Sequence, residues 1–261
     1  MTNVSSDKQE IDTAAPISIY KRLDQSNLDD FAGLIKEHTR GPGLTVFFLG
    51  RQTYLPVWAL QQKIHAWRVR GEISDVALLL EHEPVYTLGK NSNEAHLLDR
   101  RPPDADTIAI DRGGDVTYHG PGQLVGYPII DLQEHRPSVS WYMRGLEEII
   151  IRTLDSYGVS GSRMDGLPGV WVRRRKIAAL GVRLARWSTM HGFALNVDVP
   201  RRYYDGIIPC GILEYGIANL NDFLVDKTEV MDVASRLAPI MRDYLRGRNG
   251  QVSWVREEPA A

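Results

Sequence analysis

Three segments of the chain carry apolar residues at helical spacing. The clearest is 141–157, where one helical face is apolar and Gly158 follows as a natural stop. Segments 54–70 and 229–245 show the same periodicity, which predicts two further helices. Pro239 interrupts the last of them and should kink or split it, because proline lacks the N–H that an interior helical position donates.

Seven further segments are predicted to be strands, because they are short and either apolar throughout or alternate apolar with polar positions. They are 44–49, 76–81, 107–111, 124–132, 169–174, 178–187 and 192–199. These segments come in groups between the helices rather than in strict alternation with them. The sequence therefore predicts an α+β fold, a mixed and mostly antiparallel sheet with packed helices, rather than a doubly wound one.

The composition adds polar tails to this picture. At 43% hydrophobic over 261 residues, the chain can bury a substantial core. Residues 1–16 are polar and lack the apolar core of a secretory signal. We expect a disordered N-terminal tail over 1–16, a single catalytic domain over 17–247 and a C-terminal tail over 248–261.

Composition also excludes several classes of protein. The chain has no apolar run long enough to span a membrane, and its formal net charge of -2 argues against nonspecific nucleic-acid binding. A single cysteine rules out a disulfide framework and fits a reducing cytoplasm. With one cysteine and seven scattered histidines, we expect no metal site.

The stretch most informative about function is 112–123, which reads Arg-Gly-Gly-Asp-Val-Thr-Tyr-His-Gly-Pro-Gly-Gln and is called the glycine run below. Glycine permits positive φ and lets another group approach the backbone closely. The arginine, tyrosine and histidine between the glycines can hydrogen-bond or carry charge. An apolar strand follows at once. This combination predicts a ligand-binding loop set against a sheet rather than an ordinary turn.

The single cysteine and a lysine upstream of it are candidates for chemistry. Cys210 lies between Pro209 and Gly211, which hold a thiol at a defined bend. Lys176 ends a basic run and directly precedes an apolar stretch. A nearby cation lowers a thiol pKa, and a partly desolvated lysine can act as a base. From the residues alone, Cys210 is either a nucleophile or a small buried apolar residue, and the spacing does not show that Lys176 meets it.

These segments resemble the motifs of the octanoyltransferases, which belong to the biotin/lipoate protein ligase group. The similar motifs are the glycine run, Arg-Lys-Ile-Ala-Ala-Leu-Gly at 175–181, His-Gly-Phe-Ala-Leu-Asn at 191–196 and Pro-Cys-Gly at 209–211. They stand in the family's order, and the match covers roughly residues 75–225. The stretch around His82 is also similar to the family, where this loop helps to shape an acyl pocket. The resemblance implies a biotin/lipoate protein ligase-like catalytic domain.

The resemblance also implies an activity. Octanoyltransferases move an octanoyl group from an acyl carrier protein to a lysine of a lipoyl domain through a cysteine thioester. Here Cys210 would be the nucleophile and Lys176 its partner in the dyad, with no cofactor required. The implied partners are octanoyl-acyl carrier protein, the lipoyl domains of 2-oxoacid dehydrogenase complexes and the glycine cleavage H protein.

Residues matching the family's motifs would line the acyl site. They are Arg112, Gly113, Gly114, Asp115, Val116, Thr117, Tyr118, His119, Ala179, Leu180, Gly181, Gly192, Phe193 and Ala194. His82 and His191 are second-tier candidates. Backbone N–H groups near Gly113, Gly114 or Gly211 could stabilise the tetrahedral oxyanion.

Two alternatives remain open. An ATP-dependent lipoate–protein ligase needs no cysteine, and its glycine loop typically has more consecutive glycines and a His-Asp pair, where this chain has Tyr118-His119-Gly120-Pro121. A non-catalytic carrier-protein binder would hold an acylated carrier without a covalent adduct. Arginines in the same third of the chain as Lys176 could steer an acidic carrier toward the site. They are Arg173, Arg174, Arg175, Arg183, Arg186, Arg201 and Arg202.

Overall fold

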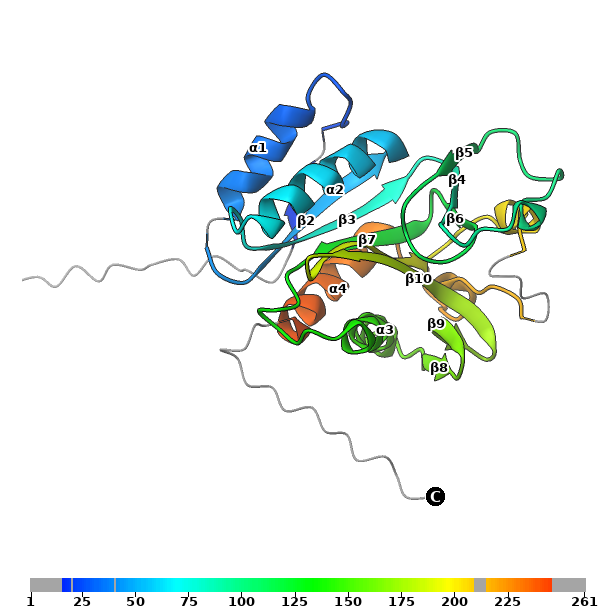
Figure 1. The fold of residues 1–261 in the computed structure, drawn as a ribbon. Coiled ribbons are helices and arrows are strands. Elements are labelled where there is room, and N and C mark those ends of the chain that lie inside the picture. The colour runs from blue at the N-terminus through cyan, green and yellow to red at the C-terminus, as the bar shows by residue number, and fades with distance from the viewer. Residues whose placement is uncertain (1–15, 20, 40, 209–214, 246–261) are drawn as a thin grey trace, which may run out of the picture.

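An eight-stranded sheet runs through the molecule in the order β1-β2-β3-β7-β11-β10-β9-β8 (Figure 1). The computed structural model describes residues 16–19, 21–39, 41–208 and 215–245, so most of both predicted tails and Cys210 lie outside the described residues. In chain order the strands are β1 (Ile17–Ser18), β2 (Leu44–Gln52), β3 (Asp75–His82), β7 (Gln123–Ile129), β8 (Ser162–Met164), β9 (Leu167–Val172), β10 (Arg175–Ala185) and β11 (Ser188–Asn196).

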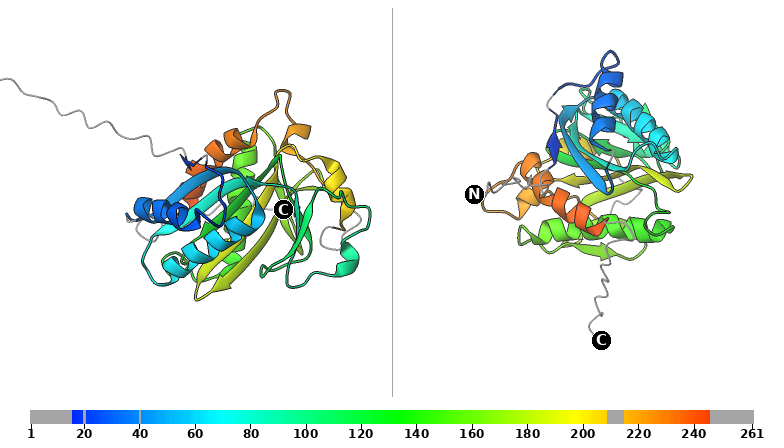
Figure 2. Two further views of the ribbon diagram at one scale, coloured as in Figure 1. Left: turned by 90° about the horizontal axis from the view of Figure 1, so that it is seen from above. Right: turned by 90° about the vertical axis from the view of Figure 1, so that its left-hand side faces the viewer.

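The sheet is mixed, as predicted from the sequence. The pairs β1–β2 and β2–β3 are parallel, whereas every pair from β3 to β8 across the sheet is antiparallel. Helices α1 (Leu28–His38) and α2 (Tyr54–Val69) pack on one face, and α3 (Val139–Asp155) and α4 (Val230–Tyr244) pack on the other (Figures 1 and 2). The predicted α+β class is confirmed.

Strand β3 shows why the central strands are apolar throughout. Val76, Leu78 and Leu80 belong to the core under α1 and α2, whereas Ala77 and Leu79 belong to the core under α3 and α4. Successive side chains of a strand point to opposite faces, so a strand covered on both sides needs apolar residues at every position.

The three predicted helices correspond to α2, α3 and α4, with small shifts at their ends. Of the two outcomes expected at Pro239, a kink or a split, the split was wrong, because α4 continues through this residue as one helix. Proline leaves the carbonyl four residues earlier without its helical donor. That carbonyl belongs to Ser235, which is exposed, so water can bond to it.

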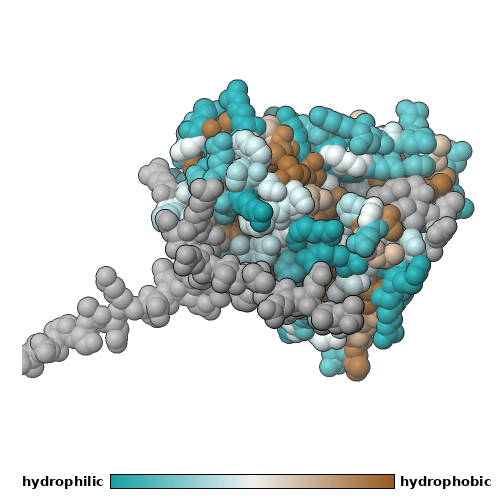
Figure 3. Space-filling view, turned by 60° about the horizontal axis from the view of Figure 1, so that its bottom comes forward, coloured by the Kyte–Doolittle hydropathy of each residue, from teal (hydrophilic) through white to brown (hydrophobic). Residues whose placement is uncertain are grey.

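A second, three-stranded sheet has the order β5-β4-β6 and carries part of the glycine run. Its strands are β4 (Val85–Leu88), β5 (Asp106–Ala109) and β6 (Thr117–His119). Short 3-10 helices complete the described fold: η1 (Glu94–His96), η2 (Arg201–Gly206) and η4 (Leu220–Asp222). The face in Figure 3 is largely hydrophilic with scattered hydrophobic residues. Within the described ranges, no helix is long and apolar enough to cross a membrane.

A buried ion pair joins α2 to the sheet. Arg68 Nε donates to Asp75 Oδ1 at 2.8 Å, and the two side chains are only 3% and 5% exposed. The other carboxylate oxygen of Asp75 lies 2.6 Å from His135 Nε2. Helix α2 also bears Tyr54, which lines the site described next, so this pair anchors the helix that carries Tyr54.

We predict that Asp75→Asn lowers the free energy of unfolding by about 1.5–3 kcal/mol, because Arg68 loses its buried charge-assisted hydrogen bond and keeps only the more exposed carboxylates of Glu134, at 2.7 Å, and Asp131, at 4.0 Å. Urea unfolding followed by circular dichroism measures this loss. The control is Glu72→Gln, which removes the partner of the half-exposed Lys36 and should cost less than about 1 kcal/mol. Equal losses in the two variants would contradict the role given to the buried pair.

Candidate active site

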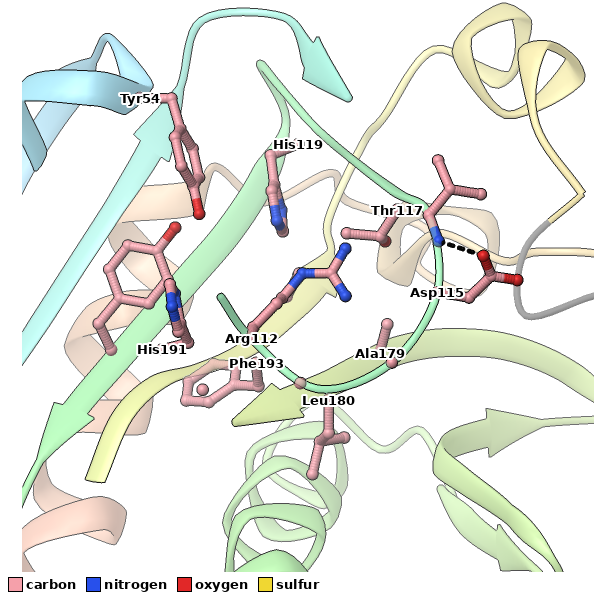
Figure 4. A pocket seen from close by; sticks show the side chains of 15 residues that line it. Tyr54, Arg112, Asp115, Thr117, His119, Ala179, Leu180, His191 and Phe193 are labelled. Atoms are coloured by element: carbon pink, nitrogen blue, oxygen red, sulfur yellow. Dashed lines mark hydrogen bonds between the residues drawn. The ribbon is translucent and has the colours of Figure 1, made fainter. Parts of the chain in front are cut away.

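A cavity lies where the glycine run meets the large sheet (Figure 4). The space between its walls, including the part that opens to solvent, is about 500 Å³. Strands β10 and β11 supply one wall, the glycine run a second, and Tyr54 and Tyr127 close the inner end. The predicted acyl-site residues that the structure brings together here are Arg112, Gly114, Asp115, Val116, Thr117, His119, Ala179, Leu180, Gly181, His191, Gly192, Phe193 and Ala194.

Three predicted residues do not line this cavity. In β6, Thr117 and His119 face the cavity, so the residue between them faces away. Tyr118 is accordingly buried in a separate aromatic cluster, where its ring stacks on Tyr203 at 4.5 Å. Gly113 lies against β10, and His82 lies behind Tyr127. The placement of Tyr118 differs from our expectation. The motif predicts where this residue stands in the chain but not which face of β6 its side chain occupies.

Tyr54 and Tyr127 were missed by the sequence analysis. Tyr54 is the first residue of α2, and Tyr127 lies in the apolar run of β7. Neither carries a local signal of function, since an aromatic residue at such a position is ordinarily core. Only the packing of α2 across β7 and β11 brings them to the cavity.

Arg112 is a buried cation held mainly by oxygen atoms of the backbone and of a hydroxyl group. It is 6% exposed, and its Nη2 donates to Thr87 O at 2.8 Å and to Thr87 Oγ1 at 2.9 Å. Its Nη1 donates to Gly113 O at 3.0 Å. A Cβ at Gly89 would lie 2.9 Å from Arg112 Nη1, and one at Gly181 would lie 3.1 Å from Arg112 Cδ. These two glycines therefore make room for the guanidinium.

The tyrosine and histidine side chains at the inner end of the cavity are uncharged at neutral pH, and the nearby Arg112 charge is held by oxygen atoms. The Tyr127 hydroxyl donates to His82 Nε2 at 2.7 Å, and His82 Nδ1 donates to Gln52 O at 3.1 Å. Complete burial lowers the pKa of His82 to about 4 and holds the pKa of His119 well below its usual value. Burial likewise raises the pKa of Tyr54. The cavity thus suits an uncharged ligand with a large apolar part.

His191 is held in a strained conformation beside this end. Its φ is 61°, in the left-handed region that residues with a Cβ rarely adopt. Its backbone N–H donates to Gln61 Oε1 at 3.1 Å, and its Nε2 lies 3.0 Å from Asp111 Oδ1. Burial lowers the pKa of His191. Strain of this kind persists only where surrounding contacts enforce it, and such positions cluster at functional sites.

Lys176 lines a smaller cavity of about 330 Å³ that adjoins the first. Val116, Thr117 and Ala179 line both, so the lysine lies next to the larger cavity. Its Nζ lies 5.0 Å from the ring centroid of Trp171. A β-bulge between Lys176 and Ala178 shifts the register of β10 at this point, and bulges commonly re-aim side chains near active sites.

The residues on both sides of the Cys210 segment also lie near these cavities. Ile208 N–H donates to His96 O at 2.8 Å. After the segment, Lys176 N–H donates to Gly216 O at 2.9 Å, and Ala218 N–H donates to Lys176 O at 2.9 Å. Cys210 itself lies outside the described residues, so the dyad remains a prediction.

The backbone N–H groups predicted to stabilise the tetrahedral oxyanion are not all free to donate to it. Gly113 N–H donates to Val182 O at 3.0 Å and is therefore occupied within the fold. Gly211 lies outside the described residues. Gly114 lines the larger cavity and remains a candidate. Among the residues that the structure describes, no cluster of three or more histidine, cysteine, aspartate or glutamate side chains could hold a metal ion.

Residues 53–241 match the family model of the lipoyl protein ligase A/B catalytic domain. An octanoyltransferase of Synechococcus elongatus is 47% identical over 175 residues, which cover 66% of this chain and 75% of the relative. An octanoyltransferase of Chloroflexus aurantiacus is 46% identical over 202 residues, which cover 74% of this chain and 90% of the relative.

Solved structures share the fold at low sequence identity. Lipoate-protein ligase A bound with ATP has a TM-score of 0.56 at 12% identity, covering 74% of this chain and 82% of that chain. A second solved structure comes from a study of a bipartite archaeal lipoate protein ligase and its E2 lipoyl domain from Thermoplasma acidophilum. It has a TM-score of 0.54 at 14% identity, and the match covers 84% of this chain and 99% of that chain. Because the family model spans most of its length, the chain belongs to the lipoyl protein ligase A/B catalytic-domain family.

Proposed function

We propose that the protein transfers an octanoyl group from an acyl carrier protein to a lysine of a lipoyl domain, through a thioester on Cys210. Octanoyl transfer is the activity named for its curated relatives, which are 46–47% identical to it. The observation that carries the proposal is the cavity with apolar walls that adjoins Lys176. A cytoplasmic location, which would keep the thiol reduced, belongs to the same proposal.

The acyl chain would lie along the apolar wall of the larger cavity. Val116, Leu180 and Phe193 supply apolar surface, and the neighbouring histidines are neutral because burial lowers their pKa. Such a site binds a medium-length chain without placing an unpaired charge beside it.

Two transfers of the same acyl group follow. Lys176 takes the thiol proton of Cys210, and the thiolate attacks the donor thioester, whose carrier sulfur leaves with a proton from the Lys176 ammonium. The neutral amine of the acceptor lysine then attacks the acyl-thioester. Lys176 accepts the amine proton, and Cys210 leaves as a thiolate. The donor is already an activated thioester, so ATP is not consumed.

The partners implied are octanoyl-acyl carrier protein as donor and, as acceptors, lipoyl domains of 2-oxoacid dehydrogenase complexes and the glycine cleavage H protein. A basic hairpin adjoins the Lys176 region and suits an acidic donor. Arg173 and Arg174 form its tip, with φ of 48° and 62°. Arg174 Nη2 donates to the Tyr215 hydroxyl at 3.1 Å, and Arg175 Nη1 lies 3.3 Å from Asp222 Oδ2.

We expect Cys210→Ser to lower the octanoyl transfer rate by roughly three orders of magnitude, because a serine hydroxyl is far less ionised than a thiol near neutral pH. The rate is measured by mass spectrometry of the lipoyl-domain acceptor, and circular dichroism checks that the variant is folded. Activity near that of the wild type would remove Cys210 from the mechanism. Activity that requires ATP and free octanoate would instead indicate a ligase.

Lys176→Ala should slow the alkylation of Cys210 by iodoacetamide at neutral pH, since loss of the ammonium raises the thiol pKa. The pH profile of the alkylation rate measures the effect. Lys36→Ala, on α1, is the control and should leave that profile unchanged. An unaltered profile in Lys176→Ala would mean that the lysine does not act on the thiol.

Replacing arginines 173–175 together by glutamate should weaken use of a carrier-borne octanoyl donor and spare a small neutral octanoyl thioester, because steering acts on the charged carrier. The control variant replaces three other basic residues by glutamate. They are Lys36 on α1, Lys63 on α2 and Arg70 directly after α2. Added salt should bring the wild type closer to the arginine variant. Unchanged preference for the carrier-borne donor at low salt would show that the hairpin is only a solvated surface.

A further inference from the structure

One buried side-chain amide binds both flanks of the Cys210 segment. The amide belongs to Asn196, at the end of β11, and it is 3% exposed. Its Oδ1 accepts a hydrogen bond from the Tyr204 hydroxyl at 2.9 Å, and its Nδ2 donates to Ala218 O at 3.2 Å. Tyr204 precedes Cys210 in the chain, and Ala218 follows it. Ala218 N–H in turn donates to Lys176 O at 2.9 Å.

The same network reaches the larger cavity through a second buried amide. Gln123 Nε2 donates to Asn196 Oδ1 at 2.9 Å and to the Tyr204 hydroxyl at 3.0 Å. Gln123 Oε1 lies 2.8 Å from His119 Nδ1, and His119 lines the larger cavity, where Figure 4 shows it beside Arg112. The network therefore extends from the wall of the proposed acyl site to the backbone of Lys176.

A single backbone carbonyl fixes the direction of every bond in this network. Ala218 O can only accept, so Asn196 must turn its NH₂ toward it and its oxygen toward Gln123. Gln123 then presents its NH₂ to Asn196 and its oxygen to His119, which must donate from Nδ1. Burial lowers the pKa of His119, which agrees with this neutral tautomer. A network in which each amide has one allowed orientation holds its members rigidly.

We infer that Tyr204 is a positioning residue for the transfer reaction: through Asn196, its hydroxyl holds the chain on both sides of Cys210 in register with Lys176. The inference rests on the proposed function, because holding the chain around Cys210 in place affects catalysis only if Cys210 and Lys176 act together. Tyr204 and Asn196 line the same cavity as Lys176. A shift of the chain at this place would therefore change the surroundings of Lys176. Loss of the hydroxyl leaves Asn196 Oδ1 with one donor fewer and loosens the contact with 216–218.

The adjacent Tyr203 supplies a matched control. It lies on the same 3-10 helix, and its hydroxyl also makes a hydrogen bond, at 2.9 Å to Asp104 Oδ2. That bond leads away from both cavities, and Tyr203 lines neither of them. Tyr204→Phe and Tyr203→Phe thus each remove one bonded hydroxyl from neighbouring positions while keeping the aromatic ring.

The test measures kcat and KM with octanoyl carrier protein, and the rate of acyl-enzyme formation in a single turnover without acceptor. Tyr204→Phe should lower kcat and the acylation rate by roughly tenfold with little change in KM, as expected when a reactive geometry is loosened. Tyr203→Phe should keep both rates within about twofold of the wild type. Thermal melting should show similar small losses for the two variants.

Equal kinetic losses in the two variants, or wild-type acylation by Tyr204→Phe, would overturn the inference. So would a loss in Tyr204→Phe that appears only in KM. In each of these outcomes the wild type still forms an acyl-enzyme, so the proposed function stands. If the wild type itself forms no acyl-enzyme, the proposed function fails, and the inference that rests on it fails as well.

Discussion

The site depends on close contact between the glycine run and the large sheet. Gly113 N–H donates to Val182 O of β10, and a Cβ at Gly181 would lie only 3.1 Å from Gly113 O. A Cβ at Gly89 would lie 2.3 Å from Gly114 O. A side chain at Gly181 would push the run away from β10 by a few tenths of an ångström, and one at Gly89, just after β4, would clash with the backbone of the run. The absence of a Cβ is therefore what turns a loop and a strand into two walls of one site.

Contact this close brings polar groups into a region without solvent, and the fold satisfies them in two ways. Arg112 keeps its charge by donating to oxygens of Thr87 and Gly113. His82 and His119 instead become neutral, because burial lowers the pKa of each. An apolar chain can then lie between the walls without meeting an unpaired charge, while Lys176 lies in the adjoining cavity.

Local patterns predicted much of the fold and most of the cavity wall, because apolar periodicity and the motifs are properties of neighbouring residues. The short strands β1, β4, β6 and β8 were missed, since so few residues carry little periodicity. Helix α1 was also missed, although Leu28, Phe31 and Ile35 stand at helical spacing. Tyr118 was expected in the site but faces the opposite side of β6. Tyr54 and Tyr127 were not expected there, because only the packing of distant elements brings them together. The pairing of Cys210 with Lys176 came from the family resemblance and not from the spacing.

The central claim is that the acyl group passes through a thioester on Cys210. Intact-protein mass spectrometry after mixing the protein with octanoyl carrier protein, without an acceptor, tests it most directly. The account predicts one octanoyl adduct, localised to Cys210 by peptide mapping, released by hydroxylamine and lost when a lipoyl-domain acceptor is added. Octanoyl transfer to the acceptor with no adduct on the enzyme at any time would contradict it.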